Sequence, residues 1–260
     1  MDCASRKFYH KHEFDCRDFL EKYCADKPDM EFAEDALQFP TMSFHYVFSS
    51  GFVKGDVLID ISMGPLIHHL YSACDIFKDI IILKLNEGCN METSRWANTR
   101  TGAFEWRHTS AYVSKLEGKS AQIQDKEMKL KEAISHIICC DFENENITHP
   151  VVLPLADCIT SIWILDAISK DEDEYMKNLE KVSKLLRPGG HLILIAALNT
   201  TFFMTGGERI YILKHDANFV INALSKVGFV IEYYAVQMRR NDSTLIDYEG
   251  VMFFTFRKTK

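Results

Sequence analysis

An acidic residue followed by a tight turn stands in the segment Val57-Leu-Ile-Asp-Ile-Ser-Met-Gly-Pro65. In nucleotide-binding α/β proteins such a segment forms a strand, a turn and the start of a helix whose N-terminus faces the ligand. Asp60 supplies the acid, and Gly64 supplies one glycine of the turn. Ser62 stands where a glycine would let the backbone approach a cofactor closely, and the bulky Met63 follows it. The segment therefore predicts a cofactor-binding turn that has been altered.

Alternating strands and helices are expected to position this turn. Short runs rich in β-branched and other apolar residues predict the strands, and amphipathic stretches predict the helices between them. The expected strands are Val57–Ile61, Asp79–Leu85, His136–Cys140, Asp157–Leu165, His191–Leu198, Phe229–Val236 and Gly250–Arg257. The expected helices are Thr93–Asn98, Asp125–Ser135, Glu172–Leu186 and Asp216–Val227. Continuous apolar strands separated by helices indicate a mostly parallel sheet that is covered on both faces.

The last two expected strands differ from the others, because the polar segment Met238–Glu249 joins them without a helical pattern. An antiparallel edge pair is therefore predicted, within a doubly wound, mostly parallel seven-stranded sheet of an α/β, Rossmann-like fold. Arg187-Pro-Gly-Gly190 is expected to end a helix before the next strand. We expect one domain, with residues 1–56 as an N-terminal arm or lid that is aromatic-rich over Phe8–Tyr23, and residues 57–260 as the core.

Composition excludes several classes of function. A 260-residue chain with 47% hydrophobic residues can bury a large core, yet no apolar run approaches the ~20 residues that span a bilayer. The net charge of −7, with basic residues scattered among acids, argues against nucleic-acid binding. The eight cysteines lack metal-ligand spacing and are expected to be free thiols in a reducing compartment. We therefore expect a cytoplasmic monomer with no metal, membrane or nucleic-acid partner.

Many short motifs follow one another over nearly the whole chain. They are Arg17-Asp-Phe-Leu-Glu-Lys-Tyr23, Lys54-Gly-Asp-Val-Leu-Ile-Asp-Ile61, Gly64-Pro65, Leu70-Tyr-Ser-Ala-Cys74, Tyr112-Val113, Leu116-Glu-Gly118, Pro154-Leu-Ala-Asp-Cys158, Leu165-Asp-Ala167, Leu186-Arg-Pro-Gly-Gly190 and Glu249-Gly250. On these motifs the chain resembles the nicotinamide, phenylethanolamine and thioether/indolethylamine N-methyltransferase family. The resemblance implies the class I methyltransferase fold, S-adenosylmethionine as the cofactor, and a small-molecule amine or thioether as the methyl acceptor.

The resemblance also implies which positions bind the cofactor. They are Tyr23, Asp60, Ser62, Met63, Gly64, Lys84, Cys89, Asp141 and Phe142. Lys84 stands where the family has an acid that accepts hydrogen bonds from both ribose hydroxyls, and an ammonium group has no acceptor. Glu87 is an alternative acceptor for the ribose hydroxyls if its side chain reaches back toward the end of the strand. Ser62 is small enough to replace the glycine of the turn if its φ is negative. Asp141 matches the acid near the adenine, and Phe142 is placed to pack against the ring.

The acceptor side is implied in the same way. The expected pocket residues are Phe19, Trp163, Ala196, Thr200 and Phe203. Ala196 replaces an acid with which the family's amine methyltransferases contact the substrate, and Phe19 keeps the ring of an arm tyrosine without its hydroxyl. Thr200 is the best remaining polar contact. No residue is assigned as catalytic, because methyl transfer from a sulfonium depends mainly on placing the acceptor lone pair against the methyl carbon.

Two functions are compatible with these substitutions. The first is an S-adenosylmethionine-dependent small-molecule N- or S-methyltransferase with weakened or lost activity, whose apolar pocket accepts a lipophilic amine or a thioether. The second is an inactive pseudoenzyme that keeps the fold and binds a metabolite or a protein partner. The substitutions gather at the cofactor turn, the ribose position and the acceptor pocket, while the packing motifs are intact. This distribution favours reduced or absent catalysis, since function follows from the site and not from the fold. The sequence identifies neither the acceptor nor a protein partner.

Overall fold

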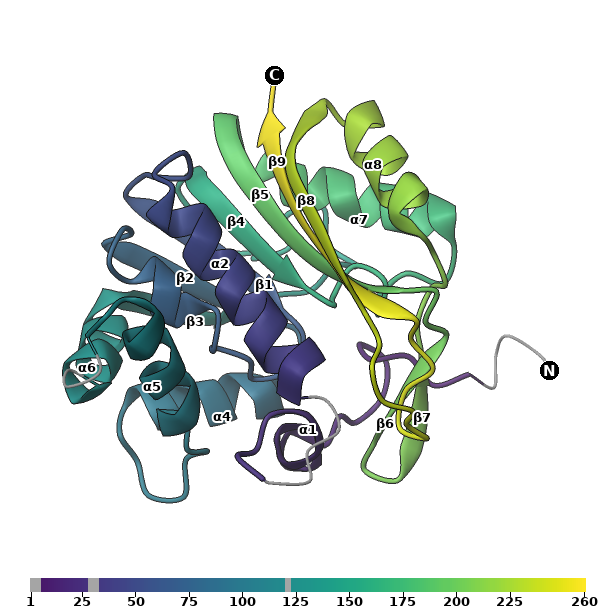
Figure 1. Cartoon of the computed structure of the whole chain (residues 1–260). Coiled ribbons are helices and arrows are strands. Elements are labelled where there is room, and N and C mark those ends of the chain that lie inside the picture. Colours follow the sequence, from purple (N-terminus) through teal and green to yellow (C-terminus); the bar gives the residue numbers. More distant parts are fainter. Residues whose placement is uncertain (1–5, 28–32, 120–122) are drawn as a thin grey trace.

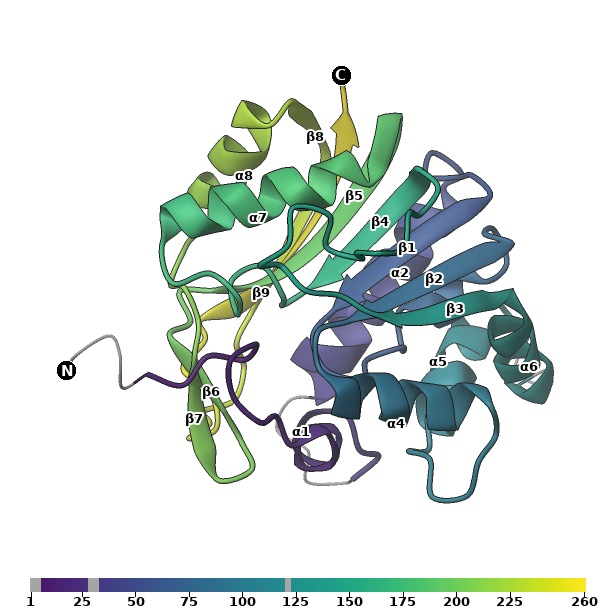
Figure 2. The ribbon, with the colours of Figure 1, turned by 180° about the vertical axis from the view of Figure 1, so that it is seen from behind.

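The computed structural model describes residues 6–27, 33–119 and 123–260, and Figures 1 and 2 show it from opposite sides. Its central sheet has seven strands in the order β3-β2-β1-β4-β5-β9-β8. These strands are β1 (Val57–Ser62), β2 (Asp79–Lys84), β3 (Ile134–Cys139), β4 (Ala156–Ile162), β5 (Leu186–Leu198), β8 (Phe229–Met238) and β9 (Gly250–Lys258). Strands β1 to β5 pair in parallel, whereas β9 is antiparallel to β5 and to β8. The predicted mostly parallel sheet with an antiparallel edge pair is confirmed.

Helices cover both faces of the sheet. The helix α2 (Phe39–Ser49) crosses the face seen in Figure 1, and α7 (Glu172–Lys184) crosses the face seen in Figure 2. The other elements are α1 (Cys16–Tyr23), the π-helix η2 (Ala33–Gln38), α3 (Leu70–Ala73), α4 (Glu87–Ala97), α5 (Arg107–Leu116), α6 (Ile123–Ala133), β6 (Phe202–Thr205), β7 (Glu208–Tyr211) and α8 (Ala217–Lys226). Among the described residues, no helix has the length and apolar character needed to cross a membrane.

The sequence pattern does not predict α2, because its residues are apolar around most of the helix and show no amphipathic period. Phe44 of α2 is fully buried. Its ring centroid lies 5.2 Å from that of Phe253 in β9 and 5.3 Å from that of His69. The helix therefore connects β9 with the segment that follows β1, where the cofactor turn lies.

The expected helix stop at Arg187–Gly190 is wrong in position. Helix α7 already ends at Lys184, and these four residues belong to the start of β5. Arg187 forms a 2.6 Å ion pair with Asp157. The same carboxylate accepts hydrogen bonds of 2.6 and 2.9 Å from two backbone N–H groups at the start of β1. The pairing of β4 with β5 shifts at this segment, since Leu186 pairs with Ala156 and His191 pairs with Cys158, and Gly189 has a φ of 77°. The four residues therefore form a bulge, which Asp157 connects to the start of β1.

The N-terminal arm and the hairpin β6–β7 lie together at one end of the sheet in both views (Figures 1 and 2). The Tyr23 hydroxyl joins them, because it donates to the carbonyls of Met204 (2.9 Å) and Leu245 (3.2 Å). The arm helix α1 begins at Asp15, whose carboxylate accepts a hydrogen bond from the backbone N–H of Asp18. The arm is thereby positioned over the end of the sheet that carries the cofactor turn.

Candidate functional site

The strand order reverses between β1 and β4, and the carboxyl ends of neighbouring parallel strands meet there. Ser62 ends β1, Lys84 ends β2, and Trp163 follows the last residue of β4. Trp163 has a φ of 52°, which ends β4 earlier than the expected Leu165. A bulky residue in this left-handed region costs roughly 1–3 kcal/mol, and such positions gather at functional sites. Ligands of open α/β sheets bind at this switch point.

A buried polar cluster lies under the switch point, centred on Asp60. Its Oδ1 accepts hydrogen bonds from Ser62 Oγ (2.6 Å) and Thr160 Oγ1 (2.8 Å), and lies 2.6 Å from His69 Nε2. Its Oδ2 lies 3.5 Å from Lys84 Nζ. Burial acts to raise the pKa of Asp60, but attraction to His69 and to Lys84 outweighs burial, so this pKa lies well below its ordinary range. The carboxylate is therefore ionised and engaged by groups of the chain itself.

Lys84 is fully buried and points into the same cluster. Its ammonium group donates hydrogen bonds to the backbone carbonyls of Ser62 (3.3 Å) and Leu66 (3.2 Å). Breaking such a buried ion pair by removing one partner costs about 3–5 kcal/mol, because the other charge is left uncompensated. The position expected to receive the ribose hydroxyls thus holds a donor that stabilises the core of the fold.

The aromatic arm closes over the turn at Gly64, which has a φ of 60°. The Gly64 N–H donates to the Tyr9 hydroxyl at 2.9 Å, and this hydroxyl lies 3.8 Å from Cys89 Sγ. A Cβ at Gly64 would lie 2.9 Å from Cε1 of Phe19, so the Phe19 ring takes the space that the glycine leaves open. Cys16 Sγ lies 2.9 Å from Cys89 Sγ, which adds a further contact between the arm and α4.

A polar groove lies on one side of the arm, near the ends of β2 and β3. Its walls include Leu85, Glu87, Asp141 and Phe142. Asp141 accepts a hydrogen bond from the backbone N–H of Glu143 at 2.9 Å, and the Phe142 side chain is buried. The two residues expected near an adenine therefore lie in an open groove, and Glu87 lines that groove as well.

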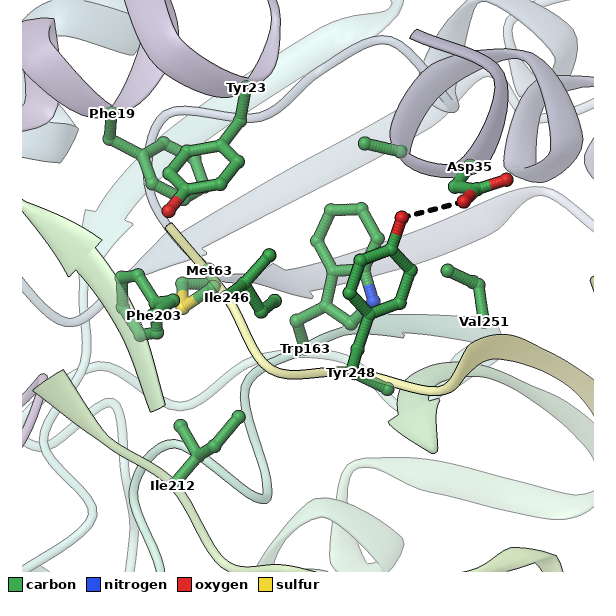
Figure 3. A pocket seen from close by; sticks show the side chains of 12 residues that line it. Phe19, Tyr23, Asp35, Met63, Trp163, Phe203, Ile212, Ile246, Tyr248 and Val251 are labelled. Carbon is green, nitrogen blue, oxygen red and sulfur yellow. Dashed lines mark hydrogen bonds between the residues drawn. The ribbon is translucent and has the colours of Figure 1, made fainter. Parts of the chain in front are cut away.

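An apolar pocket lies on the other side of the arm (Figure 3). Three residues expected in an acceptor pocket, Phe19, Trp163 and Phe203, line it. Tyr23 and Met63, which were expected to contact the cofactor, line it too. The arm, the turn after β1, the end of β4 and the hairpin strand β6 each contribute to the wall. The fold thus brings three of the five expected acceptor residues into one pocket.

Ala196 and Thr200 lie outside this wall, which corrects their expected place. Successive side chains of a strand point to opposite faces, and it is Ala197, paired with Val251, that lines the pocket. Thr200 is buried, and its hydroxyl donates to the carbonyl of Leu198 at 3.4 Å. The polar contact expected from Thr200 is therefore directed at the backbone.

Two polar residues of the pocket wall, Asp35 and Tyr248, are not predicted from the sequence. The Tyr248 hydroxyl donates a 2.6 Å hydrogen bond to Asp35 Oδ2, drawn as a dashed line in Figure 3. Asp35 comes from the π-helix η2, and Tyr248 precedes β9, 213 residues later in the chain. No local spacing marks either residue, because only the docking of the arm segment against β9 brings them together.

The fold is that of the class I S-adenosylmethionine-dependent methyltransferases. The N-methyltransferase NodS from Bradyrhizobium japonicum, solved with S-adenosyl-L-homocysteine, has a TM-score of 0.54 and 13% identity, covering 92% of this chain and 96% of that chain. Magnesium protoporphyrin IX methyltransferase from Synechocystis has a TM-score of 0.58 and 10% identity, covering 93% and 92%. At these identities the likeness shows the fold alone.

Sequence similarity narrows this class to one family. The NNMT/PNMT/TEMT family matches residues 3–259, and the chain belongs to that family. Human nicotinamide N-methyltransferase is 33% identical over 255 residues, covering 98% of this chain and 96% of that protein. Rabbit (Oryctolagus cuniculus) indolethylamine N-methyltransferase is 30% identical over 250 residues, covering 96% and 95%. The predicted family and fold class are confirmed, and S-adenosylmethionine is the cofactor of that class.

The residues at the switch point fit S-adenosylmethionine only in part. The groove at Asp141 and Phe142 offers a carboxylate and a ring to the adenine end. At the ribose end, Lys84 offers no acceptor and is engaged by the Asp60 cluster. The Gly64 N–H is engaged by the arm, which also covers the turn. Binding at the ribose end therefore requires the arm to leave the turn.

Proposed function

We propose that this chain is a small-molecule N- or S-methyltransferase in which binding of S-adenosylmethionine is weakened. The observation that carries the proposal is the apolar aromatic pocket, which lies beside the Gly64 turn and beneath the arm. The cofactor, when bound, supplies a methyl group on a sulfonium. The relatives described above are named for N-methylation of nicotinamide and indolethylamine, which supports a small acceptor molecule.

The residues of the pocket orient an acceptor and exclude water. Phe19 and Phe203 face each other with ring centroids 6.2 Å apart, and Phe14 packs behind them at 5.3 Å from Phe19. Tyr23 is held in place by hydrogen bonds to the backbone of the hairpin region. When rigid rings hold an acceptor molecule, its lone pair is oriented toward the methyl carbon before the transfer. This orientation is the main requirement of a displacement at a methyl carbon.

Lys84 is the reason for the proposed weak binding. A hydrogen bond to a charged acceptor contributes about 1.5–3 kcal/mol, so the loss of the ribose acceptor lowers cofactor affinity by roughly 10–150-fold. The closed arm adds to this effect, because the cofactor competes with the Tyr9 hydroxyl for the Gly64 N–H.

A second function, ligand binding without methyl transfer, is favoured by one specific observation. Asp60 is engaged within the chain, since its Oδ1 is bonded to Ser62, Thr160 and His69 and its Oδ2 lies 3.5 Å from Lys84 Nζ. In this pseudoenzyme the pocket binds a metabolite and the arm stays closed.

Calorimetric titration of the purified chain with S-adenosylmethionine and S-adenosylhomocysteine separates the two functions. For the methyltransferase we expect binding in the high micromolar range, weakened further by Asp141→Asn. Glu145→Gln is the matched control, because Glu145 is an exposed carboxylate in the same loop that pairs with Lys184. Absence of binding at millimolar cofactor, with the protein folded, would contradict the methyltransferase and leave the pseudoenzyme.

A further inference from the structure

Two thiols from distant parts of the chain meet where the arm contacts α4. Cys16 is the first residue of α1, and its Sγ lies 2.9 Å from Sγ of Cys89 in α4. Both cysteines are free thiols. The sulfur–sulfur bond of a disulfide is about 2 Å long, so a small approach of the two atoms is sufficient to form one. Methyl transfer has no redox step, and the pair is therefore chemistry that the proposed function does not use.

The two thiols differ in their access to solution. Cys16 is half-buried and lines an open groove between the arm, α4 and the turn of the β6–β7 hairpin. Cys89 is fully buried, and burial raises the pKa of its thiol. A Cβ at Gly88 would lie 3.3 Å from Cys16 Sγ, which places this sulfur beside the first turn of α4. A helix N-terminus favours negative charge, and a thiol attacks as the thiolate. Cys16 is therefore the thiol that attacks an oxidant, and Cys89 is the thiol that closes the bond.

The charges around this groove favour an uncharged oxidant. Lys7 is paired with Glu208, and Glu92 is paired with both Arg17 and Arg95. The basic side chains are thus engaged by acids of the chain itself and do not attract an anionic disulfide. Hydrogen peroxide is small and carries no charge, so it reaches Cys16 through the groove without any requirement for a cationic partner.

We propose that Cys16 and Cys89 form a redox modification site, at which a peroxide closes a disulfide that holds the arm over the cofactor turn. The Cys16 sulfur attacks the peroxide, a sulfur–oxygen bond forms, and the oxygen–oxygen bond breaks. Hydroxide leaves and takes up the proton that the thiol lost. The Cys89 sulfur then attacks the sulfenic acid, and the sulfur–oxygen bond breaks as the disulfide forms. The second hydroxide takes up the Cys89 proton. Two electrons and two protons pass to hydrogen peroxide, which becomes two water molecules, and a dithiol reverses the reaction by exchange.

The disulfide acts on the site through α1. Phe19 follows Cys16 by three residues, which is less than one helical turn, and its ring fills the space over Gly64. In the reduced protein, non-covalent contacts hold the arm there, among them the hydrogen bond from the Gly64 N–H to the Tyr9 hydroxyl. A covalent bond to α4 keeps Phe19 over the turn. The ribose end of the cofactor needs the arm to leave, so oxidation regulates the site. The inference rests on the proposed function at this step alone.

The test follows opening of the arm in the whole chain without cofactor. The protein is treated with hydrogen peroxide, and mass spectrometry measures both the linked peptides and hydrogen–deuterium exchange over residues 6–24. We expect a Cys16–Cys89 link, exchange of the arm slowed about tenfold or more, and recovery of both with dithiothreitol. Cys89→Ser should stop at a sulfenic acid on Cys16, which dimedone traps, and should leave the exchange unchanged. Cys139→Ser, at an exposed thiol outside the arm, should behave as the unsubstituted protein.

Two outcomes in the unsubstituted protein would overturn the proposal, and neither needs a variant to fold. One is the absence of the Cys16–Cys89 link after peroxide treatment, and the other is a link with unchanged exchange of the arm. Titration with S-adenosylhomocysteine separates this inference from the proposed function. Binding to neither the reduced nor the oxidised protein would refute the methyltransferase and not the modification site. Equal binding to both forms would refute control of the site by the disulfide and leave the methyltransferase.

Discussion

At the scale of single residues, a change of charge at one position alters what the site can bind. Lys84 places an ammonium group 3.5 Å from Asp60 Oδ2, where the family resemblance leads one to expect a second acid. The ammonium group is fully buried and donates to two backbone carbonyls. Lys84 therefore stabilises the fold, and under the proposed function it also leaves the ribose without an acceptor. From the sequence alone, Lys84→Asp is expected to restore an acceptor for the ribose hydroxyls. In the structure, however, the new carboxylate would lie beside the carboxylate of Asp60 and repel it.

We predict that Lys84→Met lowers the free energy of unfolding by about 3–5 kcal/mol at neutral pH, because Asp60 loses a buried counterion. The pKa of Asp60 is lowered in the folded protein, so its contribution to stability is present above the ordinary carboxyl pKa of about 4 and declines as the pH falls below it. Urea denaturation between neutral pH and pH values below about 4 measures this. The difference between the two proteins should shrink with acidification, and a constant difference would contradict the role given to the ion pair.

At the scale of elements, the arm connects the cofactor turn with α4. Tyr9 bonds to Gly64, and Phe19 covers that glycine. Cys16 of α1 contacts Cys89 of α4 through sulfur atoms 2.9 Å apart, 73 residues apart in the chain. Burial raises the pKa of the Cys89 thiol, so the more accessible Cys16 is the thiol that reacts first with a reagent in solution.

We predict that the azo oxidant diamide joins Cys16 to Cys89. The two thiols lose two electrons and two protons to the azo group, which becomes a hydrazine. Peptide mapping by mass spectrometry identifies the linked peptides, and titration with S-adenosylhomocysteine should show weaker binding to the oxidised protein because the arm is held closed. Cys16→Ser should abolish both effects, whereas Cys139→Ser, at an exposed thiol outside the arm, should retain them. Unchanged binding by the cross-linked protein would contradict a closed arm that competes with the cofactor.

At the scale of the whole molecule, the arm separates two spaces at the same end of the sheet. The polar groove contains Asp141 and Phe142, and the apolar pocket contains Asp35 and Trp163. The chain passes from His10 in the groove to Phe19 in the pocket. Tyr9, next to His10, bonds to Gly64, and the intervening Cys16 contacts Cys89. Ligands in the two spaces are therefore expected not to touch while the arm is closed.

We predict that adenosine and 2-phenylethylamine bind independently. Each should raise the thermal unfolding midpoint, since a ligand that binds only the folded state stabilises it, and the two effects should add. Differential scanning fluorimetry with each ligand alone and with both ligands together measures this. Phe203→Ala should reduce only the amine effect, because Phe203 lines the apolar pocket, and Asp141→Asn should reduce only the adenosine effect. Displacement of one ligand by the other would show that the two spaces are one.

The sequence by itself determined the family and the sheet with its antiparallel edge pair. These follow from local features, since apolar runs, turn residues and motif spacing are set by residues close together in the chain. Helix α2 was not predicted, because its exposed face carries Met42 and Tyr46, and these apolar side chains remove the amphipathic period from the sequence. The bulge at Arg187–Gly190 was not predicted either, because it depends on the pairing of β4 with β5.

Only the tertiary structure decided which side chains meet. The sequence places Lys84, Asp35 and Cys16 without showing that they face Asp60, Tyr248 and Cys89. It also does not show that Ala197 and not Ala196 lines the pocket, because a shift of one residue in a strand moves a side chain to the other face. Such pairings depend on strand register and on the docking of the arm, which are set by packing over the whole sheet and not by any local pattern.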